Sequence, residues 1–130
     1  MSDVELAATL AAAVPVGASA YLLTVAPDGR PHATPTTAVV RGASSVVVSG
    51  LGRRTRANVE AGSTVAVLWS PPDSDDHTLI VDGTAVVHDD TLVVRPTRAV
   101  LHRQAPERPA AAGPVADGAC TADCVEIALA

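Results

Sequence analysis

The spacing of apolar residues changes several times along the chain, and each change predicts an element. Ser2 and Glu5 form a capping box, and apolar residues follow at helical spacing until Pro15, which indicates one short helix. After Ala18 the pattern becomes that of strands. Strands are predicted at Ala20–Ala26, Pro31–Val40, Ser45–Ser49, Ser63–Ser70, His77–His88, Leu92–Arg95 with Thr97–His102 extending it past Pro96, and Cys124–Leu129.

The segments between the strands contain residues that favour turns. Pro27–Arg30 predicts a hairpin turn, because Pro presets φ and Gly29 accepts a left-handed backbone. Pro35 indicates an edge or bulge in its strand, and Gly83 indicates a bulge. The segment from Gly50 to Gly62 predicts a loop followed by a short helix. Residues 104–118 show no periodicity and are expected to form a long loop.

The number of strands determines the fold that we expect. Six to seven short antiparallel strands with one or two short helices favour a mainly β barrel over a sandwich. The chain has 130 residues, which is enough for one domain, taken as 1–130. An open half-barrel of this size would expose apolar sheet, so we expect a partner copy to cover it.

The composition indicates which side chains fill the core. Hydrophobic residues make up 48% of the chain, but Phe is absent and Tyr21 and Trp69 are the only aromatic residues. The core must therefore be built from Val and Ala, which favours strands, and Trp69 is expected in the core or in a dimer interface. Acids stand at the N-terminus, and no apolar run approaches a membrane span, so we expect a cytoplasmic protein that does not associate with membranes.

The formal charge of −5 conceals an uneven distribution of basic residues. All nine basic residues are Arg; residues 30–60 contain five of them and one Glu, whereas residues 73–90 contain six Asp and no Arg. An acidic chain with two aromatic residues lacks the stacking platform of a nucleic-acid binder, and we expect no such partner.

The densest basic segment is Arg53-Arg54-Thr55-Arg56, which follows a Gly-x-Gly turn and begins the predicted helix. Backbone N–H groups, a hydroxyl and guanidinium groups would converge there, as they do where proteins hold a phosphate. A solvated basic face is the alternative, because arginines often cluster on surfaces and Gly-x-Gly is a weak signal.

The order of three motifs resembles the pyridoxamine 5'-phosphate oxidase-like family of flavin-binding split β-barrels. The motifs are Asp28-Gly29-Arg30-Pro31-His32, Arg53-Arg54-Thr55-Arg56-Ala57-Asn58 and Val81-Asp82-Gly83-Thr84-Ala85. The resemblance runs from about Ala18 to His102. It implies a Greek-key-like split barrel that forms a homodimer, with FMN or the 8-hydroxy-5-deazaflavin coenzyme in a cleft that both subunits share.

The resemblance also implies which residues contact the cofactor. The phosphate would be held by Arg53, Arg54, Thr55, Arg56 and Asn58, and the ring would lie against Thr36, Thr37, Val48 and Ser49. Flavin-binding members usually carry an Arg-Lys pair where Arg54-Thr55 stands here, so one point charge of the phosphate site is missing. The chain lacks a counterpart to the C-terminal substrate-binding segment of the true oxidases, and oxidation of vitamin B6 is not expected.

Three functions are compatible with these motifs and with the family resemblance. The first is an oxidoreductase that uses the cofactor on a small conjugated substrate; the second is a non-catalytic carrier or sensor of flavin or haem; the third is a barrel that no longer binds a cofactor. The catalytic residues are left open, because hydride chemistry belongs to the cofactor and no catalytic triad is visible. His32, His77, His88 and His102 are candidate proton donors, with half-exposed surface histidines as the favoured alternative.

The cysteines give little indication of function. Cys120 and Cys124 are four residues apart, lack a second pair of ligands at metal spacing, and are expected to be ordinary buried thiols rather than a metal or redox site.

Overall fold

The protein is a mainly β structure in which a closed antiparallel barrel carries one extra strand. The structure is a computed structural model that describes residues 10–42, 45–104 and 122–129. Its elements are β1 (Ser19–Val25), β2 (Pro31–Arg41), β3 (Ser45–Ser49), α2 (Arg53–Glu60), β4 (Val65–Ser70), β5 (Thr78–His88), β6 (Thr91–Gln104) and β7 (Ala122–Ile127). A helical turn at Leu10–Ala13 precedes β1.

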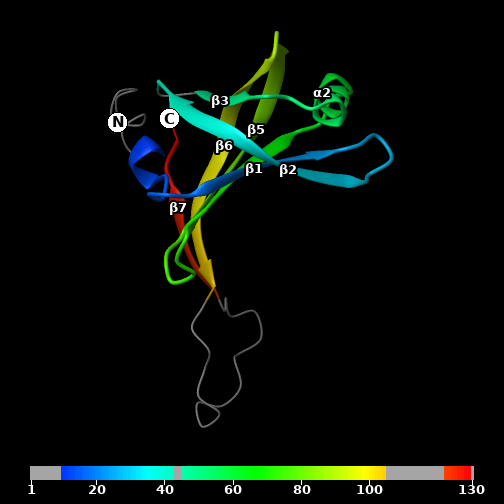
Figure 1. Ribbon diagram of the computed structural model, residues 1–130. Helices are drawn as coiled ribbons and strands as arrows, with labels where there is room; N and C mark the ends of the chain where they lie inside the picture. The colour runs from blue at the N-terminus through cyan, green and yellow to red at the C-terminus, as the bar shows by residue number, and fades with distance from the viewer. Residues whose placement is uncertain (1–9, 43–44, 105–121, 130) are drawn as a thin grey trace.

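The sheet closes on itself and thereby corrects one expectation. The strand order is β3-β2-β1-β4-β5-β6-β7, and β3 also pairs with β6, so six strands form a ring and β7 lies outside it (Figure 1). The expected open half-barrel is therefore wrong. Two strands that are distant in sequence close the ring, since Val46 to Ser49 pair with Val94 to Thr91.

Most predicted elements are present with small shifts of their ends. The third strand and the beginning of the helix at Arg53 are as predicted. Pro96 does not end β6, because it lies opposite the register shift at Asp82/Gly83, where the predicted bulge occurs. Pro35 pairs with Tyr21 of β1, and the pairing of β2 with β3 begins only at Thr37, so Pro35 has a free edge on its other side.

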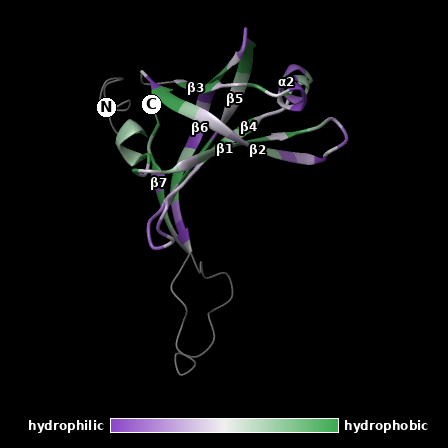
Figure 2. Cartoon of the chain, in the orientation of Figure 1, coloured by the Kyte–Doolittle hydropathy of each residue, from purple (hydrophilic) through white to green (hydrophobic). Residues whose placement is uncertain are grey.

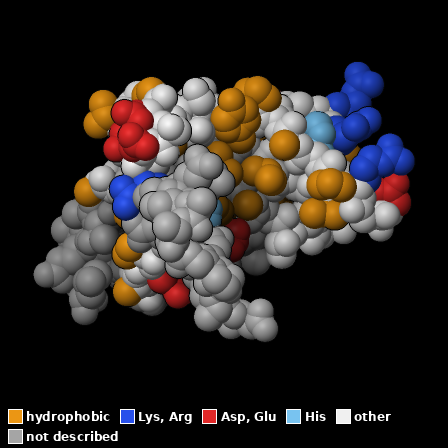
Figure 3. All heavy atoms as spheres, turned by 90° about the horizontal axis from the view of Figure 1, so that it is seen from below, with side chains coloured by type: hydrophobic (Ala, Val, Ile, Leu, Met, Phe, Trp, Pro, Cys, Tyr) orange, Lys and Arg blue, Asp and Glu red, His pale blue; other side chains and the backbone are white. Residues whose placement is uncertain are grey.

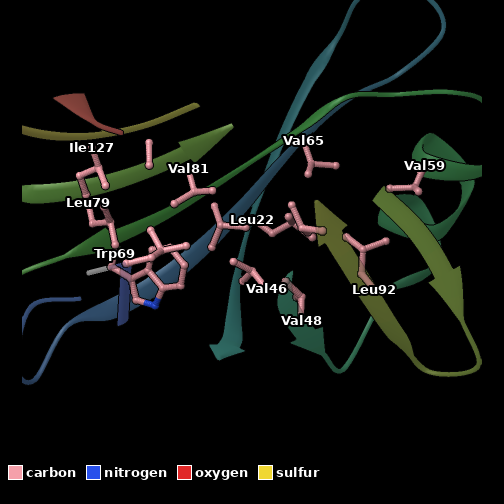
Figure 4. Packing of buried hydrophobic residues seen from close by; sticks show 14 residues of the cluster. Leu22, Val46, Val48, Val59, Val65, Trp69, Leu79, Val81, Leu92 and Ile127 are labelled. Carbon is pink, nitrogen blue, oxygen red and sulfur yellow. The ribbon is translucent and has the colours of Figure 1, made fainter. Parts of the chain in front are cut away.

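The core consists mainly of Val and Leu side chains that meet inside the ring (Figure 4), and Ala99 is the only Ala among the buried core residues of the described chain, so Ala contributes less than the composition predicts. Val46 and Val48 of β3, Val67 of β4 and Val81 of β5 each have 0% exposure. Trp69 was expected in the core or in a dimer interface. It is 3% exposed and lies in the core. Stiff Val side chains fill this volume with little loss of rotamer entropy on folding.

The β1–β2 hairpin and α2 lie at the same end of the molecule. The β1–β2 hairpin extends from the barrel toward the end of the molecule that carries α2, and hydrophilic residues are concentrated at the hairpin tip and on α2 (Figures 1 and 2). α2 packs against β1 and β5. Across the described ranges, no helix has the length and apolar character needed to span a membrane. Residues 2–9 of the predicted first helix and residues 105–118 of the predicted loop lie outside those ranges.

Candidate anion and cofactor site at helix α2

The first turn of α2 carries uncompensated positive charge. Its N-cap is Gly52, which offers no side-chain acceptor, and the first turn contains no acidic residue. The N–H groups of Arg53, Arg54 and Thr55 precede the first intrahelical bond, which runs from Arg56 N to Gly52 O at 3.1 Å. The helix dipole and two exposed arginines therefore add to one another here.

Local sequence explains why the arginines face solvent. Thr55, Asn58 and Val59 are the buried residues of α2, and their i, i+3 and i+4 spacing places them on one helix face. Arg53 and Arg54 lie outside that face and are exposed. Neither side chain forms a hydrogen bond or an ion pair within the described residues. Both guanidinium groups are thus available to an anion.

Arg56 has a different environment from the other two arginines. Its Nη2 donates to the backbone carbonyl of Asp89 at 2.8 Å and lies 3.5 Å from Asp90 Oδ1. Asp89 has a φ of 54°, which turns the chain tightly between β5 and β6. Arg56 therefore ties α2 to this turn, and of the three predicted arginines it has the fewest donors left for a ligand.

The two polar residues on the inner face of α2 are buried. Asn58 is 4% exposed, and its Nδ2 donates to Thr24 Oγ1 at 3.0 Å. Thr55 is 1% exposed, and its Oγ1 has no partner among the described atoms. An unpaired buried hydroxyl costs free energy, so Thr55 differs from Asn58 although the sequence predicts the same role for both.

The four residues predicted to face the ring do not share one surface. Thr37 and Ser49 are exposed and lie opposite each other in the β2–β3 ladder. Thr36 is half-buried on the other face of β2, and its Oγ1 donates to the Ser49 carbonyl at 3.3 Å. Val48 points into the core with 0% exposure, so its side chain is not available to a ligand.

A small cavity lies between the β1–β2 turn and α2. Its volume is about 140 Å³, and its lining is Ala26, Asp28, Arg30, Pro31, His32, Arg54 and Asn58. The sequence motif from Asp28 to His32 supports the family resemblance, but its residues are absent from the predicted site. The motif could have indicated that these residues belong to the site. Only the tertiary fold, however, brings their side chains to the cavity that Arg54 also lines.

The remaining candidate residues are scattered. His88 is exposed at the β5–β6 turn, whereas His77, directly before β5, and His102 of β6 are half-buried and lie far from α2. His102 Nδ1 lies 3.1 Å from Cys124 Sγ. Cys124 is exposed, so the expectation of a buried thiol is wrong there, because β7 lies outside the ring and, among the described strands, pairs with β6 alone. Cys120 lies outside the described residues.

A family model and a curated relative both match most of the chain. The family model described as pyridoxamine 5'-phosphate oxidase matches residues 8–117. The uncharacterized protein Mb0449c of Mycobacterium bovis is 42% identical over 132 residues, with 89% of each chain covered.

Two solved structures share the fold. HupZ from Group A Streptococcus has a TM-score of 0.60 at 13% identity and covers 72% of this chain and 90% of its own. An F420 reductase has a TM-score of 0.56 at 20% identity and covers 68% of this chain and 93% of its own. At these identities the likeness concerns the fold, whereas the family model covers most of the sequence. On that match, the chain belongs to the pyridoxamine 5'-phosphate oxidase family.

Proposed function

We propose that this protein binds FMN or the 8-hydroxy-5-deazaflavin coenzyme through α2 and serves as an oxidoreductase for a small conjugated substrate. Members of the family generally bind a flavin or deazaflavin, and one structural neighbour is an F420 reductase. The observation that carries the proposal is the pair Arg53 and Arg54, which are exposed at the uncapped start of α2 without acidic partners in the described chain.

The residues present fit a phosphate group. Free N–H groups at the start of a helix and two guanidinium groups are the donors that proteins use for phosphate. The unpaired Thr55 hydroxyl lies in the same turn, but its burial keeps it from a ligand in this conformation. Arg53 and Arg54 would thus provide the charge that family members share between Arg and Lys.

The exposed hydroxyl groups of Thr37 and Ser49 would orient the polar edge of the ring. The bond from Thr36 to the Ser49 carbonyl holds the end of β3, from which the chain leads through Gly50 to α2. When bound, the cofactor would supply hydride chemistry. The protein would orient the substrate and exclude water, and these tasks require no catalytic triad.

A second copy of the chain is proposed to complete the cleft. Tyr21, Leu23, Val25 and Val39 are 37, 36, 46 and 49% exposed, and they share the outer face of β1 and β2. Exposed apolar side chains gathered on one face of a sheet favour an interface. Sedimentation is expected to show a dimer that Leu23→Glu dissociates, whereas Val86→Glu, at a residue 68% exposed on β5, leaves it intact. A monomeric wild type would contradict this part of the proposal.

The decisive experiment measures the visible spectrum of the purified protein and its titration with FMN, riboflavin and the deazaflavin coenzyme. FMN or the deazaflavin coenzyme should bind at least about tenfold more tightly than riboflavin, and Arg54→Ala should remove most of that advantage, because a charge-assisted contact contributes roughly 1.5–3 kcal/mol. The matched control is Arg41→Ala, since Arg41 is an exposed arginine at the opposite end of the β2–β3 ladder.

The titration, followed by a turnover assay, also separates an oxidoreductase from a flavin carrier or sensor. Binding with turnover of reduced cofactor supports the oxidoreductase, and binding without turnover on any electron acceptor supports a carrier or sensor. If neither phosphate-bearing cofactor binds, the proposed function is wrong.

A further inference from the structure

We propose that the cavity between the β1–β2 turn and α2 is a proton-linked oxyanion site, in which His32 adds a second positive charge to that of Arg54. Its ligand class is a phosphate or carboxylate group. Basic side chains gather around a histidine at this end of the molecule, with an acidic side chain beside them (Figure 3). The cofactor site proposed at α2 contains no residue of the β1–β2 turn. The side chains that line this cavity from the turn therefore extend that site.

The cavity contains donors that lack partners. Arg54 is exposed and His32 half-buried, and neither side chain has a hydrogen bond or an ion pair to another described residue. They come from different elements, α2 and β2, and line the same cavity of about 140 Å³. Donors from two elements that face one small space are the arrangement expected of a ligand site.

The base of the cavity is fixed in position. Asn58 lines it and is 4% exposed, and its Nδ2 donates to Thr24 Oγ1, which is itself 2% exposed. This bond orients the amide and leaves its second N–H for another acceptor. A rigid base lowers the entropy that a bound anion would otherwise have to offset.

The charges at the cavity favour an anion. The titratable and charged groups that line it are Asp28 and Arg30 of the turn, His32 of β2 and Arg54 of α2. Arg30 Nη2 lies 3.4 Å from Asp28 Oδ2, and both side chains are mostly exposed, so these two charges largely cancel. Arg54 remains as one net positive charge, and protonation of His32 makes two.

The size of the cavity limits the ligand to a single group. Pockets that hold whole drug-sized ligands have volumes of about 300–1,000 Å³, which is more than this cavity offers. A phosphate or carboxylate group fits, and the planar fork of Arg54 is suited to two of its oxygens. The group can come from the cofactor, in which case the inference rests on the proposed function, or from a free anion or substrate.

The test uses inorganic sulfate as the probe, because its charge stays constant over the pH range in which histidine titrates. Sulfate affinity is measured by NMR titration of the apoprotein at about pH 5.5 and about pH 8. We expect about five- to tenfold tighter binding at the lower pH, since imidazolium donates a charge-assisted hydrogen bond and neutral imidazole does not. His32→Gln should abolish this pH dependence.

Two further variants serve as controls. His88→Gln changes an exposed histidine at the β5–β6 turn and should leave the pH dependence intact. Arg54→Gln should weaken sulfate binding at both pH values, which keeps the proposal testable if His32→Gln does not fold. Sulfate affinity that is the same at both pH values in the wild type, or that keeps its pH dependence in His32→Gln, would overturn the inference.

The source of the anion follows from FMN and riboflavin titrations of His32→Gln. Weaker binding of FMN at low pH, with riboflavin unchanged, identifies the cofactor phosphate as the ligand; unchanged FMN binding beside weakened sulfate binding identifies a free or substrate anion. His32-dependent sulfate binding without any flavin binding would support this inference and contradict the proposed function. Tight FMN binding with no sulfate binding would do the reverse.

Discussion

Two hairpin turns flank α2, and they use its arginines differently. On one side, the β5–β6 turn presents the Asp89 carbonyl and the Asp90 carboxylate to Arg56. On the other side, the only acid of the β1–β2 turn, Asp28, faces its neighbour Arg30, and Arg54 has no acidic partner in the described chain. Arginines two residues apart therefore have different roles, and the position of an acceptor decides which one holds the fold and which one is available to a ligand.

The largest expected effect concerns the bond that holds α2 on the β1 side. Asn58→Ala should lower the free energy of unfolding by about 1–3 kcal/mol, because it leaves the buried Thr24 hydroxyl without its partner and opens a small cavity. Urea denaturation of the apoprotein measures the loss.

The double variant Thr24→Val with Asn58→Leu is the matched control for this prediction. Replacing both partners by apolar groups removes the unpaired hydroxyl, so the double variant should lose less stability than Asn58→Ala. A double variant that loses as much stability as Asn58→Ala, or more, would contradict the prediction, because it would show that the unpaired Thr24 hydroxyl is not the cause of the loss.

The next effect separates the two arginines directly. Arg56→Ala should lower the free energy of unfolding by about 1 kcal/mol, because the Asp89 carbonyl loses its charged donor, and it should weaken FMN binding less than Arg54→Ala does. Arg54→Ala should leave stability unchanged. Thermal melts and FMN titrations of both variants give the comparison.

Arg53→Ala is the stability control, since Arg53 is an exposed arginine of the same helix turn with no partner in the described chain. Equal losses of stability in Arg53→Ala and Arg56→Ala would show that the contact at the β5–β6 turn is not specific. Equal losses of FMN affinity in Arg54→Ala and Arg56→Ala would remove the functional difference between the two sides.

The strands and the basic segment could be predicted because their signals are local. Alternation and turn residues mark β1 to β6, and the arginines after Gly52 are visible as a cluster. The role of Arg56 could not be predicted, since its acceptor Asp89 lies 33 residues away in sequence. The closure of the ring by β3 and β6 is equally non-local.

The sequence does not reveal which way the side chains of Val48 and Cys124 face, and the reason differs between the two. Val46, Val47 and Val48 are identical, so the pattern does not reveal which of them faces the core, and a shift of one residue exchanges the faces. Thr37 and Ser49 prove to be the exposed pair. The strand pattern predicts that Cys124 is buried. It is exposed because β7 lies outside the ring, which the local sequence does not indicate.

The smallest expected effect is that of substituting Thr55, which stands where flavin-binding members usually carry a Lys. Thr55→Val replaces an unpaired buried hydroxyl with a methyl group of similar size, so it should leave the free energy of unfolding unchanged or raise it by up to about 1 kcal/mol. FMN affinity should change less than about twofold, because the hydroxyl does not reach the surface on which Arg54 lies. Urea denaturation and FMN titration measure the two quantities. A loss of affinity as large as that of Arg54→Ala would mean that α2 shifts on binding and brings Thr55 to the anion, and the division of α2 into a buried structural face and an exposed binding face would then be wrong.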